Sequence, residues 1–61
     1  MFDFNVSGDF NATEIQIGAV TERAKAFLAQ LFGHGAVSVN IPKSRGEDLM
    51  RYFQQKGFSV G

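Results

Sequence analysis

The 61-residue sequence contains no cysteine and a single histidine, His34. The absence of cysteine excludes disulfide bonds, thiolate metal sites and a thiol nucleophile. One histidine is too few for a histidine-rich metal site, so we expect no metal and no cofactor. Without such cross-links a chain this short is marginally stable, because it buries only about 60% of its unfolded surface. Self-association is therefore a physical expectation.

The sequence also lacks a net charge, since six basic residues balance six acidic ones. Residues 1–20 carry three acidic and no basic side chains, whereas residues 21–61 carry all six basic side chains and three acidic ones. The basic excess of a dedicated DNA-binding protein is missing. A signal-peptide pattern at the start and an apolar run of about 18 residues are missing too. We therefore expect a cytoplasmic protein that does not associate with membranes.

Proline occurs once, and it marks a clear boundary in the chain. Before it, Val37, Val39 and Ile41 alternate with small or polar residues, which predicts a strand with one buried face. Pro42 ends this run, because it cannot donate a hydrogen bond within a sheet. Residues 44–47, with the sequence SRGE, fit a capping box and predict that a helix begins there.

The end of this second predicted helix is also marked in the sequence. Leu49, Met50 and Phe53 form one apolar stripe at helical spacing. Gly57 is suited to the left-handed conformation that terminates helices, and Phe58 is then expected to contact Phe53, as in a Schellman motif. Residues 58–60 are expected to form a short last strand.

The N-terminal segment alternates apolar and polar side chains, which predicts a strand. Its apolar side chains are Phe2, Phe4 and Val6. The pair Gly8-Asp9 suits a two-residue hairpin turn. Pairing across that turn places Ser7 opposite Phe10 and Asp3 opposite Glu14. Two adjacent carboxylates could share a proton or a hard cation, but two ligands are too few to bind Ca²⁺ or Mg²⁺ well, so a solvated pair is favoured.

Residues 14–32 allow two interpretations. A second capping-box pattern at residues 13–16 and apolar residues at heptad-like spacing make an unbroken helix from 14 to 32 possible. A strand to about residue 18 and a helix from about residue 21 are favoured, because Gly18 costs about 1 kcal/mol inside a helix and Thr21 is a suitable N-cap. The hairpin also needs a second strand. This helix is expected to bury Ala24, Phe27, Leu28 and Leu31 and to stop at Gly33-His34-Gly35.

These elements predict an α+β fold, a single small two-layer domain over residues 1–61 with the order β-β-α-β-α-β. We expect a mixed four-stranded sheet with both helices on one face, because the strand at 37–41 has one apolar face. The order of the strands stays open. The other face is expected to be open to water or a partner, and it carries Asp3, Asn5, Glu14, Gln16, Ser38 and Asn40. The layout resembles small orphan reading frames of phages and other mobile elements, a resemblance that rests on no motif and implies no activity.

Lys43, Ser44, Arg45 and Gly46 form a candidate anion-binding site. Free amides at a helix start, a glycine that allows close approach and two cations could hold a phosphate or a carboxylate. Ordinary helix capping is the favoured interpretation of the same residues, since two acidic residues follow directly and already satisfy the helix dipole.

Phe10 is expected on the polar side of the sheet, where an exposed aromatic is either incidental or anchors an interface. Asn5, Ser38 and Asn40 lie on the same side and are further interface candidates. His34 is expected to be a loop residue, because no serine or threonine is placed beside it as a nucleophile.

The function predicted from these features is that of a non-enzymatic interaction module. We expect a homo-oligomer, most simply a dimer, that binds a protein partner through the open sheet face or a strand edge. The alternative is a weak nucleic-acid or anion binder that uses residues 43–46. An enzyme is the least favoured class, because the sequence offers no activated nucleophile.

Overall fold

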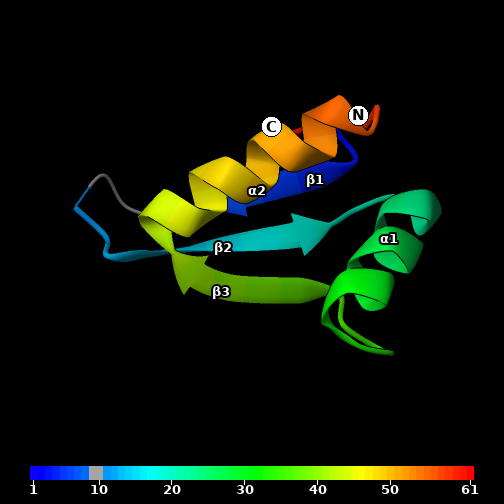
Figure 1. Ribbon diagram of the computed structural model, residues 1–61, viewed down its shortest axis with the longest axis horizontal. Coiled ribbons are helices and arrows are strands. Elements are labelled where there is room, and N and C mark those ends of the chain that lie inside the picture. The colour runs from blue at the N-terminus through cyan, green and yellow to red at the C-terminus, as the bar shows by residue number, and fades with distance from the viewer. Residues whose placement is uncertain (9–10) are drawn as a thin grey trace.

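The computed structural model describes residues 1–8 and 11–61 and contains three strands and two helices (Figure 1). The elements in chain order are β1 (Phe4–Ser7), β2 (Glu14–Ala19), α1 (Glu22–Phe32), β3 (Ser38–Pro42) and α2 (Lys43–Gln55). Helix α2 packs against β2 and β3, and α1 lies near the end of β2 (Figure 1). The protein thus has the α+β composition expected from its alternating strand patterns and helical stripes.

The three strands form one sheet in the order β1-β2-β3, and both neighbouring pairs are antiparallel. The mixed four-stranded sheet expected from the sequence is not found among the described residues. The predicted last strand is reduced to an isolated parallel bridge between Val60 and Phe4. The strand order, which the sequence left open, places β2 in the centre.

The antiparallel pairing of β2 with β3 follows from the path of the chain between them. Gly18 lies opposite Ser38, so the chain leaves the sheet before α1 and returns to it after α1 at the same end. An 11-residue helix is about 16 Å long, and five extended residues span about 17 Å. Residues 33–37 are therefore long enough to bring the chain back to where α1 began. The chain then has no need of the crossover that a parallel pair requires.

The register of the hairpin differs from the predicted one. A two-residue turn would pair Ser7 with Phe10. In the structure Ser7 pairs with Gln16. The connection between β1 and β2 spans residues 8–13, and residues 9–10 within it lie outside the described part of the chain. Each β1 residue is displaced by six positions along β2. Because the displacement is even, every strand side chain keeps its predicted face.

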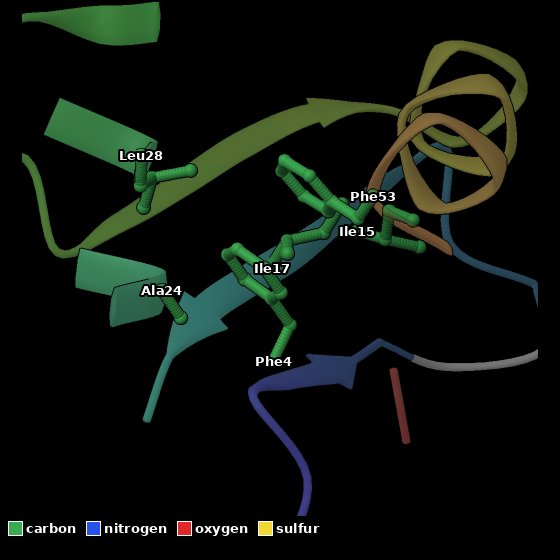
Figure 2. Packing of buried hydrophobic residues seen from close by; sticks show 6 residues of the cluster. All are labelled: Phe4, Ile15, Ile17, Ala24, Leu28 and Phe53. Atoms are coloured by element: carbon green, nitrogen blue, oxygen red, sulfur yellow. The ribbon is translucent and has the colours of Figure 1, made fainter. Parts of the chain in front are cut away.

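One face of the sheet and both helices enclose the core (Figure 2). Its buried apolar residues are Phe4, Ile15, Ile17, Ala24, Leu28 and Phe53. The rings of Phe4 and Phe53 stack with their centroids 4.0 Å apart and an interplanar angle of 2°. Side chains from both helices thus meet the same sheet face, as the one-sided alternation of the strands predicts.

Helix α1 begins and ends where the sequence signals lie. The Thr21 hydroxyl accepts a hydrogen bond of 3.2 Å from the Ala24 amide, which makes Thr21 the N-cap. Gly33 ends the helix with a φ of +117°, and its amide donates to the Ala29 carbonyl at 2.8 Å. The interpretation as strand followed by helix is confirmed, and an unbroken helix over residues 14–32 is wrong.

The C-terminus of α2 is the predicted Schellman motif. The Phe58 amide donates to the Phe53 carbonyl at 3.0 Å, and the Gly57 amide donates to the Gln54 carbonyl at 3.1 Å. Gly57 has a φ of +92°, which a glycine adopts without steric cost. The rings of Phe53 and Phe58 meet edge to face at 6.4 Å between centroids. Both the termination and its hydrophobic contact are confirmed.

The predicted start of α2 is wrong. The helix begins at Lys43, directly after Pro42, and its N-cap makes no side-chain hydrogen bond. Ser44 therefore lies inside the first turn and does not cap it. A tertiary contact supplies part of the missing capping, because the Lys43 amide donates to the Thr13 carbonyl at 3.0 Å.

Gly46 is buried where the first turn of α2 crosses the sheet. A Cβ atom added at this position would contact the Ile15 Cδ1 atom and lie only 2.7 Å from Ile15 Cγ1. The glycine thus permits close approach of α2 to β2, and its place in the sequence reflects packing within the protein.

Three apolar residues that the patterns assign to the core are exposed. They are Phe2, Leu31 and Val37, with 52%, 42% and 55% of their surface accessible. Phe2 precedes β1, Leu31 lies in the last turn of α1 and Val37 precedes β3. Each lies at the end of an element, where the helix layer and the sheet layer overlap less.

Candidate functional site

The face of the sheet away from the helices is open and polar. Its strand residues Asn5, Glu14, Gln16, Ser38 and Asn40 are all exposed, as predicted. None of the residues of the three strands on this face is aromatic, so the strands themselves supply no large apolar group with which to anchor a partner. The Gln16 amide nitrogen donates to the Ser38 hydroxyl at 3.4 Å, a long contact between exposed groups.

The outer side of β3 is a free strand edge, because among residues 1–8 and 11–61 β3 pairs only with β2. In an antiparallel strand, the backbone groups of alternate residues point to opposite sides. The Ala19 amide donates to the Val37 carbonyl at 2.9 Å, so the odd-numbered residues of this segment face β2. Ser38 and Asn40 therefore direct their N–H and C=O groups outward.

Apolar side chains accompany this free edge on the core side of the sheet. Val39 and Ile41 are only half-buried, in contrast to the fully buried Ile17 of the central strand. Val37 is more exposed still. The free edge thus combines unpaired backbone groups with a row of incompletely covered aliphatic side chains, and we call residues 37–42 the β3 edge.

Residues 59–61 cover the opposite edge of the sheet. The Val6 amide donates to the Gly61 carbonyl at 2.9 Å, and the Gly61 amide donates to the Phe4 carbonyl at 2.9 Å. The Phe4 amide donates to the Ser59 carbonyl at 3.1 Å. Three outward backbone groups of β1 are thereby satisfied, namely both groups of Phe4 and the amide of Val6, so the two edges of the sheet differ in their capacity to pair.

Comparisons with models of protein families, with curated proteins and with solved structures found no match. Among residues 1–8 and 11–61, no pocket is found and no three potential metal ligands are grouped. In the same part of the chain, neither helix is long and apolar enough to cross a membrane.

The predicted register would place Asp3 opposite Glu14 on the open side of the sheet. In the structure it lies elsewhere. Its carboxylate is buried and accepts hydrogen bonds from Thr21 Oγ1 at 2.7 Å and from Arg23 Nη2 at 2.9 Å. The Ser59 amide donates to the same carboxylate at 3.0 Å. The N-terminal segment, the start of α1 and the C-terminal segment thus meet at one acidic side chain.

This carboxylate is strongly stabilised in its charged form. The side-chain hydrogen bond from Arg23, the Ser59 amide and the Thr21 hydroxyl hold the pKa of Asp3 far below its ordinary value, against the opposing effect of burial. The same contact raises the pKa of Arg23. Arg23 also donates to the Gly57 carbonyl at 2.8 Å and lies 4.6 Å from the Phe58 ring centroid. The arrangement ties chain segments together.

No local sequence pattern predicts this cluster. Its partners lie 18, 20 and 56 positions from Asp3 along the chain, so no local spacing relates them.

The structure places the candidate anion-binding residues in the first turn of α2. The Lys43 amide already donates to Thr13, and Gly46 faces Ile15 in the interior. Ser44 and Arg45 are exposed. The geometry thus gives the glycine a packing role, and anion binding at residues 43–46 stays a prediction.

The remaining candidates divide by position. His34 lies exposed in the turn between Gly33 and Gly35, as expected of a loop residue. Phe10 lies outside the described residues, so its role as an interface anchor stays a prediction.

Proposed function

We propose that the protein is a non-enzymatic interaction module that binds protein by adding a strand at the β3 edge. The observation that carries this proposal is the outward direction of the backbone groups of Ser38 and Asn40. Unpaired N–H and C=O groups along a strand are a template for another strand, and main-chain hydrogen bonds supply the affinity in such complexes.

The β3 edge is favoured over the open sheet face for a physical reason. The strand residues on that face are polar, and they supply few of the contacts that dominate interface energies. Binding at the edge satisfies backbone groups and also covers the exposed surface of Val37 and of the half-buried Val39 and Ile41. Apolar burial stabilises a complex by roughly 25 cal/mol per Å² of surface removed from water.

Edge strands that must stay unpaired are usually protected by lysines, inward-pointing charges or bulges. The sequence of β3, SVNIP, contains no charged residue. Its one protective feature is Pro42, which lacks an N–H group and limits the length of any added ladder. A short, neutral edge of this kind suits reversible pairing.

The test compares binding by the wild-type protein with binding by two variants. Asn40→Pro removes an outward N–H group while leaving the groups that face β2, because proline is tolerated on the free side of an edge strand. Gln16→Lys is the matched control, since it adds a charge to the centre of the open face. It removes the long contact with the Ser38 hydroxyl and leaves the outward backbone groups of the β3 edge in place.

We expect immobilised wild-type and Gln16→Lys proteins to retain the same binding proteins, or further copies of the chain, and Asn40→Pro to lose them. Circular dichroism confirms that each variant is folded. Retention that is unaffected by Asn40→Pro but abolished by Gln16→Lys would move the binding surface to the sheet face and contradict the proposal.

A further inference from the structure

We infer that the occupant of the β3 edge is the β3 edge of a second copy, paired antiparallel about a two-fold axis at Val39. This inference rests on the proposed function and specifies its partner. The result is a continuous six-stranded sheet across two copies, with α1 and α2 of both on one side.

The hydrogen-bonding groups decide the register. With Val39 opposite its counterpart, Ser38 of each copy lies opposite Asn40 of the other, and the two pairs form four backbone hydrogen bonds. A register centred on Asn40 would set Ser38 opposite Pro42, which has no N–H to donate. A register centred on Ser38 would set Asn40 opposite Ala36, whose amide already donates to the Gly33 carbonyl at 3.2 Å.

The side chains support the same register independently. On the core side, Val39 meets Val39, and Val37 of each copy meets Ile41 of the other. The three aliphatic residues that each copy leaves incompletely covered are thereby paired across the interface. On the polar side, Ser38 and Asn40 lie opposite each other, and both can donate and accept hydrogen bonds. Cross-strand pairs of these kinds are favourable.

The absence of charge on β3 also permits self-pairing. An isologous interface sets each residue near its own kind, so a charged edge would repel itself. Because β3 carries no charge, no like charges are opposed along the ladder. Just beyond the strand, Lys43 lies opposite the uncharged Gly35 in this register.

The interface is small, so we expect the two copies to bind each other weakly. Five residues paired at one edge bury less than the roughly 1,600 Å² of a standard interface. We expect a reversible dimer with a dissociation constant of about 1 μM or weaker, so the concentration range must extend to about 1 mM.

The first measurement is sedimentation equilibrium across that range. We expect a monomer–dimer equilibrium for the wild type, the same equilibrium for Gln16→Lys and a monomer for Asn40→Pro. Wild-type protein that stays monomeric throughout overturns the inference. Dimerisation lost in Gln16→Lys and kept in Asn40→Pro overturns it as well.

The second measurement maps the register and uses the absence of native cysteine. Ser38→Cys and Asn40→Cys are mixed and oxidised, and each variant is also oxidised alone. Directly opposed residues of this kind have Cα atoms about 5.5 Å apart, within the range of a disulfide, whereas residues displaced by two are about 7–8 Å apart. We expect a cross-linked dimer from the mixture and little from either variant alone. Equal cross-linking of Asn40→Cys alone overturns the register.

The two proposals fail separately. A monomeric wild type that still captures a different protein, lost on Asn40→Pro, removes self-pairing and leaves strand addition at the β3 edge in place. A monomeric wild type that captures nothing removes both.

Discussion

At the residue scale, the Asp3 carboxylate holds the N-terminal and C-terminal segments together through hydrogen bonds with Thr21, Arg23 and Ser59. Asp3→Asn replaces a carboxylate oxygen with an NH₂ donor, which then faces the donors of Thr21, Arg23 and Ser59. We expect the variant to unfold at lower temperature and lower denaturant concentration than the wild type at pH 7. Glu14→Gln is the control, because it neutralises an exposed carboxylate on the open face. Equal stability of Asp3→Asn and the control would contradict the role assigned to Asp3.

The pH dependence of the same residue follows from the direction of its pKa. Asp3 has a lower pKa in the folded state than in the unfolded chain, so the unfolded state binds a proton first as pH falls. Its stabilising contribution is complete above the ordinary aspartate pKa of about 3.9 and is lost as pH falls below that value. We expect wild-type urea unfolding midpoints to fall between pH 5 and pH 2.5 by more than those of Asp3→Asn. Parallel pH profiles would contradict this assignment.

Gly46 is a second residue whose role is fixed by packing. In an exposed helix, Gly→Ala stabilises by about 1 kcal/mol, but here the new Cβ meets Ile15, and overpacking costs about 1–3 kcal/mol. We expect Gly46→Ala to lower the free energy of unfolding by up to about 2 kcal/mol in urea titrations. Ile15→Val removes the nearest atom and should recover part of this loss in a double-mutant cycle. A more stable Gly46→Ala protein would show that α2 does not approach β2 so closely.

The start of α2 can be checked in the same titrations. Replacing a serine N-cap by alanine costs about 1 kcal/mol, whereas an exposed position within a helix changes stability by less than about 0.5 kcal/mol. Because Ser44 lies inside the first turn, we expect Ser44→Ala to fall in the second class. A loss of about 1 kcal/mol would restore the capping box.

At the scale of elements, the sequence predicts what local interactions decide. Thr21 and Gly33 delimit α1, and Gly57 with Phe58 closes α2, because each signal satisfies backbone groups within a few residues. The start of α2 was not predictable in this way, since the Lys43 amide is satisfied by Thr13, 30 positions earlier in the chain. Local capping signals were overridden there by a tertiary contact.

In the candidate site too, local patterns predict some features, and contacts between distant segments decide the others. Alternation at residues 37–41 predicts a strand with polar and apolar sides, and those sides are correct for Ser38 and Asn40. Whether that strand is central or at an edge depends on pairing between distant segments, which alternation does not encode. The hairpin register escaped prediction for a related reason, since the length of a connecting loop is not set by the strands it joins.

At the scale of the whole molecule, residues 59–61 cover the β1 edge of the sheet, whereas the β3 edge is free. This difference leads to a final prediction. Residues 59–61 satisfy three outward backbone groups of β1 and contact Asp3, so removing them exposes a second free edge. We expect the shortened protein to be less stable and to associate further, beyond a dimer, because each copy then has two edges able to pair.

In the Asn40→Pro background, the β3 edge is blocked, and association should stop at a dimer formed through β1. Sedimentation of the four proteins, with and without residues 59–61 and with and without Asn40→Pro, separates the contributions of the two edges. If the shortened Asn40→Pro protein remains monomeric and folded, then residues 59–61 act only on stability, and β1 is not a second pairing edge.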